Sequence, residues 1–72
     1  MKQYVYWMKL RPPGPGAQPM EGLIRCNNRE IWYNGSHYWG ESVYNRELTK
    51  EETDHYDMVL HKTITNDQGE TE

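Results

Sequence analysis

One cysteine and three histidines are the side chains of this 72-residue chain that could attack a carbonyl or bind a soft metal ion. They are Cys26, His37, His55 and His61. Structural zinc sites use close pairs, such as two cysteines two residues apart or two histidines three to five residues apart. Five residues separate His55 from His61, but a predicted helix ends between them and no second pair accompanies them. The sequence therefore predicts no metal site and no cofactor.

Cys26 also lacks the surroundings of a catalytic nucleophile. Such a cysteine needs a histidine base that a third group holds in place. It usually also needs a cleft, and a chain of this size rarely encloses the volume of about 300 Å³ that a small ligand occupies. Within the stretch LIRCN we expect Cys26 to be a small core or near-core residue, and we expect the protein not to be an enzyme.

Arginines beside aromatic residues raise the alternative of nucleic-acid binding. Arg11, Arg25 and Arg29 lie in or near predicted strands with Tyr and Trp, a combination that stacks single-stranded bases. The pI of about 5.5 disfavours this alternative, because nucleic-acid-binding domains are usually basic. Residues 1–46 carry six basic and three acidic side chains, whereas residues 47–72 carry two basic and eight acidic ones. An acidic decoy of a nucleic-acid enzyme is therefore a second alternative.

All four prolines lie in the stretch RPPGPGAQP, residues 11–19. Pro12 and Pro15 match the loose PxxP spacing of proline-rich ligands. The favoured interpretation is structural: the prolines end the first strand, carry the chain stiffly to the next and shield aromatic side chains. The residues that we single out as a candidate interaction surface are Arg11, Pro12, Pro13, Pro15, Arg25, Arg29, Trp32 and His37.

The elements that position these residues are mostly strands. Residues 2–11 and 20–27 predict two strands, and NNRE at residues 27–30 predicts a turn after the second. The strongest local signal is EIWYNGSHYW, because Asn-Gly between two aromatic runs is the preferred two-residue hairpin turn. The predicted cross-strand pairs of this hairpin are Tyr33 with Ser36, Trp32 with His37, and Ile31 with Tyr38.

The C-terminal half predicts a strand, a helix and a last strand. Gly40 predicts a bulge or a close approach of the backbone, and residues 41–48 extend the hairpin strand. Thr49 is a helix N-cap and Glu52 completes a capping box, so we expect a short helix from Lys50 to Tyr56. Residues 57–62 predict the final strand.

These elements predict one small α+β domain over residues 1–62 and a disordered acidic tail over residues 63–72. The fold expected is a mostly antiparallel sheet of four to five strands, with one Asn-Gly hairpin and one short helix. The chain has no Phe but three Trp and six Tyr. Because aromatic side chains bury the largest areas, we expect Trp7, Trp32, Trp39 and the tyrosines to supply most of the core.

Two sequence elements give a resemblance to a known group. Residues 11–19 fit RPP-x-PGA-x-P, and residues 39–52 fit WG-x₂-VY-x-R-x-LT-x-EE, with Ser42 where the spacing of the group differs by one residue. The chain thereby resembles small accessory proteins carried by conjugative transposons and prophages of gut Firmicutes. The resemblance implies a mobile-element accessory protein and brings no catalytic residues or cofactor with it.

The favoured function is a protein-interaction module, because a small sheet with surplus Trp and Tyr has the composition of interface hot spots. The expected partner is an unidentified protein, or a second copy that pairs through an edge strand. The chain shows no apolar run near 18 residues and no charged leader, so we expect a cytoplasmic protein that does not span a membrane.

Overall fold

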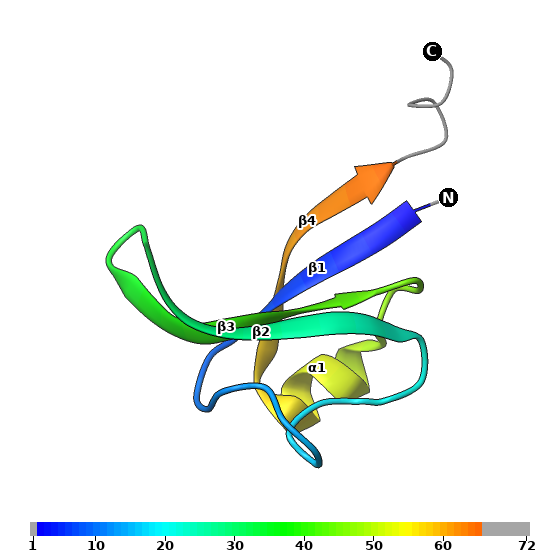
Figure 1. Cartoon of the computed structure of the whole chain (residues 1–72), viewed down its shortest axis with the longest axis horizontal. Coiled ribbons are helices and arrows are strands. Elements are labelled where there is room, and N and C mark those ends of the chain that lie inside the picture. The colour runs from blue at the N-terminus through cyan, green and yellow to red at the C-terminus, as the bar shows by residue number, and fades with distance from the viewer. Residues whose placement is uncertain (1, 66–72) are drawn as a thin grey trace.

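The computed structural model describes residues 2–65, which form one four-stranded sheet and one short helix. In chain order the elements are β1 (Lys2–Met8), β2 (Leu23–Tyr33), β3 (Ser36–Tyr44), α1 (Lys50–Tyr56) and β4 (Met58–Thr65). The strand order is β2-β3-β1-β4, and all neighbouring strands are antiparallel. Figure 1 shows α1 and the loop between β1 and β2 on one side of the sheet. The predicted α+β fold is confirmed.

The last strand is longer than the sequence indicated. β4 continues to Thr65, so three residues of the predicted tail pair with β1 through contacts such as Thr63 with Tyr4. The rest of the predicted tail, residues 66–72, lies outside the described residues.

β1 is the central strand and is covered on both faces. Val5, Tyr6, Trp7 and Met8 are all buried, with exposed fractions of 7% or less. Consecutive side chains of a strand point to opposite faces. Tyr6 and Met8 therefore enter the core beneath the sheet, whereas Trp7 is covered from the other face.

The core beneath the sheet consists of Tyr6, Met8, Tyr44, Leu48 and Met58. Two tyrosine rings meet edge to face there, with centroids 5.8 Å apart. Methionine and leucine side chains supply the rest.

Two of the indoles expected in the core lie outside it. Trp32 is 69% exposed, Trp39 is 40% exposed and, among the tyrosines, Tyr33 is 51% exposed, so the prediction is wrong for these three residues. Unbranched methionine side chains fill irregular gaps between elements, and Met8 and Met58 are part of the core.

Both buried phenols have hydrogen-bond partners. The hydroxyl of Tyr44 donates to the carbonyl of Pro19 at 2.6 Å, and the hydroxyl of Tyr6 accepts from the amide of Leu48 at 2.8 Å. Burial raises the pKa of both phenols, and at Tyr6 the Leu48 N–H opposes part of the increase. The two tyrosines thereby bind two loops to the sheet: Tyr44 binds the loop between β1 and β2, and Tyr6 binds the loop between β3 and α1.

The proline segment lies against the core. Pro13, Gln18 and Pro19 are buried, and the side-chain carbonyl of Gln18 accepts a hydrogen bond of 2.9 Å from the amide of Gly14. β1 ends at Met8, three residues before the predicted end. The segment therefore covers the sheet instead of extending it.

The turn predicted at residues 27–30 is wrong. β2 runs through these residues without a break, and the register with β3 shifts by one between Asn28 and Ile31. A β-bulge inserts one extra residue and bends the strand. NNRE is polar because it lies in an exposed, bulged edge strand, and such a strand shares its composition with a turn.

The predicted hairpin register and helix are confirmed. Asn34 and Gly35 both have positive φ, as the predicted turn requires, and all three predicted cross-strand pairs form. α1 spans the predicted residues, and both hydrogen bonds of the Thr49 and Glu52 capping box are present. Gly40 makes the predicted close approach, since a Cβ there would collide with the Asn27 carbonyl and the Pro13 ring.

Candidate functional site

The hairpin of β2 and β3 exposes a row of three aromatic side chains. Trp32 and His37 are a cross-strand pair with ring centroids 4.5 Å apart, and His37 contacts Trp39 edge to face at 4.8 Å. Large aromatic side chains usually bury most of their area. Trp32 and Trp39 are instead 69% and 40% exposed, and with the half-buried His37 they form a cluster of rings at the surface, hereafter the aromatic row.

Other rings of the same hairpin fold back over the sheet. The indole of Trp7 contacts the ring of Tyr33 at 5.3 Å and that of Tyr38 at 4.9 Å. The imidazole of His61, from β4, stacks on Trp7 with centroids 3.7 Å apart. Together with Val59 and Leu60 these residues line a hollow of about 190 Å³, hereafter the aromatic hollow.

The carboxylate of Glu41 contacts Trp7 at the edge of the aromatic hollow. One oxygen of Glu41 accepts hydrogen bonds from the indole N–H of Trp7 at 3.4 Å and from the guanidinium of Arg29 at 3.2 Å. Burial lowers the pKa of the stacked His61, and the charge of Lys62 lowers it further. The hollow therefore offers an uncharged, aromatic surface near neutral pH.

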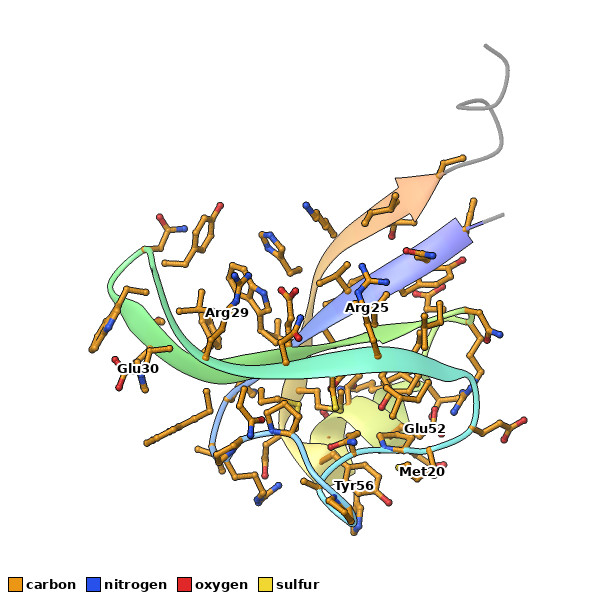
Figure 2. All side chains as sticks on the ribbon, viewed as in Figure 1. Met20, Arg25, Arg29, Glu30, Glu52 and Tyr56 are labelled. Carbon is orange, nitrogen blue, oxygen red and sulfur yellow. The ribbon has the colours of Figure 1, made fainter. Side chains whose placement is uncertain are left out.

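The predicted arginines do not gather into one basic surface. Arg11 pairs with Asp57 at 3.3 Å, and Arg29 pairs with Glu41. Arg25 is exposed and forms no ion pair within residues 2–65. Figure 2 shows Arg25 and Arg29 on the side of the sheet opposite Tyr56. Two of the three candidate guanidinium groups are thus already engaged by carboxylates.

Of the three prolines in the candidate surface, one is buried and two are exposed. Pro12 and Pro15 are exposed, whereas the ring of Pro13 is buried against Gly40. The amide of Ala17 donates to the carbonyl of Gly14 at 2.9 Å, which closes a turn inside the segment. The segment is a folded loop, so the PxxP pair is not presented as an extended polyproline helix.

Cys26 and the three histidines do not form a reactive constellation. Cys26 is exposed on β2, which contradicts its predicted place in or near the core. The ring of His37 belongs to the aromatic row, that of His61 stacks on Trp7, and that of His55 contacts Tyr56 at 4.6 Å. Within residues 2–65 no three potential ligands come close enough to hold a metal ion.

Several residues of the surface escaped the sequence analysis. Trp39 and Tyr38 were assigned to the core, His61 was considered only as a metal ligand, and Glu41 had no role. A local signal exists only for Trp39, because strand alternation from Trp32 and His37 places it near them. The contacts of Glu41 and His61 with Trp7 join distant parts of the chain, and no spacing in the sequence reports them.

Within residues 2–65 no helix is long and apolar enough to span a membrane, since α1 has only seven residues.

Comparison with protein families gives one match. The model of the family described as Defence against restriction A C-terminal matches residues 1–63. The match covers β1, β2, β3 and α1 completely, and β4 as far as Thr63. No curated protein and no solved structure matches the chain.

Proposed function

We propose, from the premise that the chain belongs to the Defence against restriction A C-terminal family, that it is a non-enzymatic protein-binding module that helps a mobile element withstand restriction. The family is associated with phages and other mobile elements. The two sequence elements at residues 11–19 and 39–52 further support a carrier among the conjugative transposons and prophages of Firmicutes.

The observation that carries this proposal is the exposure of the aromatic row. Trp32 and Trp39 leave large apolar surfaces in water on a hairpin whose turn and register are well defined. Tryptophan is enriched among the residues that dominate binding energy at protein interfaces. A rigid hairpin also loses little conformational freedom on binding, which favours affinity.

The same rings could stack on unpaired bases. Arg29, which lies in the bulge of β2, is bound to Glu41, and the chain has a net charge of −3. A protein partner is therefore favoured over nucleic acid. Tryptophan fluorescence with a single-stranded oligonucleotide across a salt series separates the two, because electrostatic binding to nucleic acid weakens steeply with salt.

The proposal is tested by measuring survival of the mobile element in a restricting host. The double variant Trp32→Ala and Trp39→Ala removes the exposed rings, and Leu10→Ala, which removes another exposed apolar side chain outside the row, is the matched control. We expect the double variant to lose about tenfold or more of the protection, the size typical of interface hot spots. Undiminished protection by a folded double variant would reject the proposal.

A further inference from the structure

β4 forms one edge of the sheet, and a hollow lies on each side of it. Its inner edge pairs with β1 from Met58 to Thr65, and no strand within residues 2–65 pairs with its outer edge. An unpaired edge presents backbone N–H and C=O groups that can accept another strand. Val59 and Leu60 line both hollows, so the two hollows meet at the first residues of this edge.

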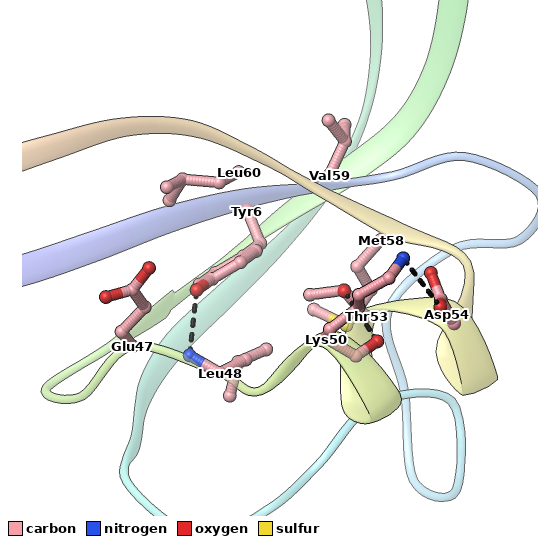
Figure 3. A pocket seen from close by; sticks show the side chains of 9 residues that line it. All are labelled: Tyr6, Glu47, Leu48, Lys50, Thr53, Asp54, Met58, Val59 and Leu60. Atoms are coloured by element: carbon pink, nitrogen blue, oxygen red, sulfur yellow. Dashed lines mark hydrogen bonds and ion pairs between the residues drawn. The ribbon is translucent and has the colours of Figure 1, made fainter.

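The hollow beneath the sheet, between β4 and α1, is acidic. It has a volume of about 320 Å³, and Tyr6, Leu48 and Leu60 give it an apolar wall. Glu47 and Asp54 stand at opposite ends of its mouth (Figure 3). We call it the acidic hollow.

Its charges are not balanced. The ammonium group of Lys50 lies 3.2 Å from a carboxylate oxygen of Asp54, so this pair is neutral as a whole. Glu47 forms no ion pair within the described part of the chain and leaves one negative charge at the mouth. The charged residues that line this hollow are Glu47, Asp54 and Lys50, a net charge of −1, so a cationic side chain fits here better than an anionic one.

The aromatic hollow on the other face differs in chemistry. Trp7, Tyr33, Tyr38 and His61 offer ring surfaces there, and the one carboxylate at its rim, Glu41, is already bound by Trp7 and Arg29. An apolar side chain would bury area against these rings without leaving a polar group unpaired.

We propose that the outer edge of β4 binds an extended segment of a partner protein, in which an apolar residue lies directly beside an arginine or lysine. Consecutive side chains of a strand point to opposite faces. A segment paired with β4 would therefore place its apolar side chain in the aromatic hollow and the neighbouring cation in the acidic hollow. Backbone hydrogen bonds supply affinity in such strand addition, and the flanking hollows supply specificity.

This site goes beyond the proposed function, because it lies on β4 and does not use Trp32 or Trp39. Failure of peptide binding to β4 would leave the restriction assay on the aromatic row unaffected. Loss of the aromatic row would likewise leave peptide binding to β4 in place. The two claims can therefore fail separately.

The test uses the full chain, isotope-labelled, and three eight-residue peptides of Ser and Thr with Val-Arg, Val-Glu or Ser-Arg at the centre. We expect the Val-Arg peptide to shift the amide resonances of Val59, Leu60 and His61. We expect it to bind about three- to tenfold more tightly than either other peptide, a factor typical of one partly exposed ion pair or one small apolar contact. Equal binding of all three peptides, or no binding at millimolar concentration, would overturn the proposal.

A charge reversal provides the second arm. Glu47→Lys should weaken the binding of the Val-Arg peptide and strengthen the binding of the Val-Glu peptide. Glu30→Lys makes the same change of charge at an exposed position on β2. It should change the affinity for either peptide by no more than about twofold, because exposed charges interact weakly through water. A dimer in sedimentation with protected β4 amides would show instead that a second copy occupies the edge, and would also overturn the proposal.

Discussion

The phenol hydroxyl of Tyr44 on β3 donates a 2.6 Å hydrogen bond to the backbone carbonyl of Pro19, at the end of the proline segment. Both groups are buried, and they are 25 residues apart in the sequence. This bond joins the loop that leaves β1 to the strand that carries the hairpin. It explains how a segment that cannot be a strand still contributes to the sheet's stability.

Tyr44→Phe should destabilise the protein by about 1–2 kcal/mol, because the carbonyl of Pro19 would stay buried without a partner. Urea unfolding monitored by circular dichroism measures the change. Tyr33→Phe removes a hydroxyl from a ring that is 51% exposed and serves as the control. A Tyr44→Phe variant as stable as the Tyr33→Phe variant would show that the bond contributes nothing.

Gly40→Ala should cost about 1–3 kcal/mol, the usual effect of overpacking. The new Cβ would lie against the carbonyl oxygen of Asn27 and 2.6 Å from Cδ of Pro13. Gly14→Ala is the matched control, because a Cβ at Gly14 meets no atom within 4 Å. If both variants melt at the wild-type temperature, the close packing of Gly40 under the proline loop is refuted.

Replacing Pro12 or Pro13 by serine should lower the melting temperature by different amounts. Pro13 is buried against Gly40, so Pro13→Ser loses packing as well as the stiffness of the ring. Pro12 is exposed, so Pro12→Ser loses only the stiffness. We expect the melting temperature to fall more for Pro13→Ser, by about 4–8 °C for each kcal/mol of additional loss. The opposite order in calorimetry would contradict the packing described for this loop.

Glu52 should make the free energy of unfolding depend on pH in the acidic range. Both of its oxygens accept hydrogen bonds from Arg46, at 3.0 and 2.9 Å, and the amide of Thr49 donates to it as well. These bonds lower the pKa of Glu52 from 4.5 to about 2. Its contribution is therefore complete above pH 4.5 and disappears as the pH falls toward 2.

Glu52→Gln should reduce the loss of stability across this window, as read from urea midpoints at a series of pH values. Glu51→Gln, beside it on α1, keeps the bonds between Glu52 and Arg46 and should keep the wild-type dependence. Identical acid profiles for Glu52→Gln and the wild type would show that the Arg46 pair does not govern the response.

The hairpin and the helix could be predicted because their signals are local. Asn34-Gly35 fixes the turn and with it the register, and Thr49 with Glu52 fixes the start of α1. The break predicted at residues 27–30 failed because pairing with β3, and not local preference, keeps β2 continuous there.

The candidate surface could be predicted only in part. Alternation along the hairpin pairs Trp32 with His37, but it does not tell which face the remaining chain will cover. α1 and the proline loop cover the face that contains Tyr6 and Met8. The aromatic row lies on the hairpin, whose tip extends beyond α1 and the proline loop (Figure 1), and the core contains methionine instead. Glu41 and His61 reach Trp7 only after folding, so no sequence pattern could assign them to the hollow.

The central claim is that the exposed indoles of the hairpin contact a protein. Photo-crosslinking tests it most directly, with benzoylphenylalanine placed at position 32 in the full chain and expressed with its mobile element. Position 20 is the control, because Met20 is also exposed (61%) but lies in the loop between β1 and β2 and not on the hairpin. We predict a covalent protein adduct from position 32 and none from position 20. An adduct to nucleic acid, or equal adducts from both positions, would contradict the account.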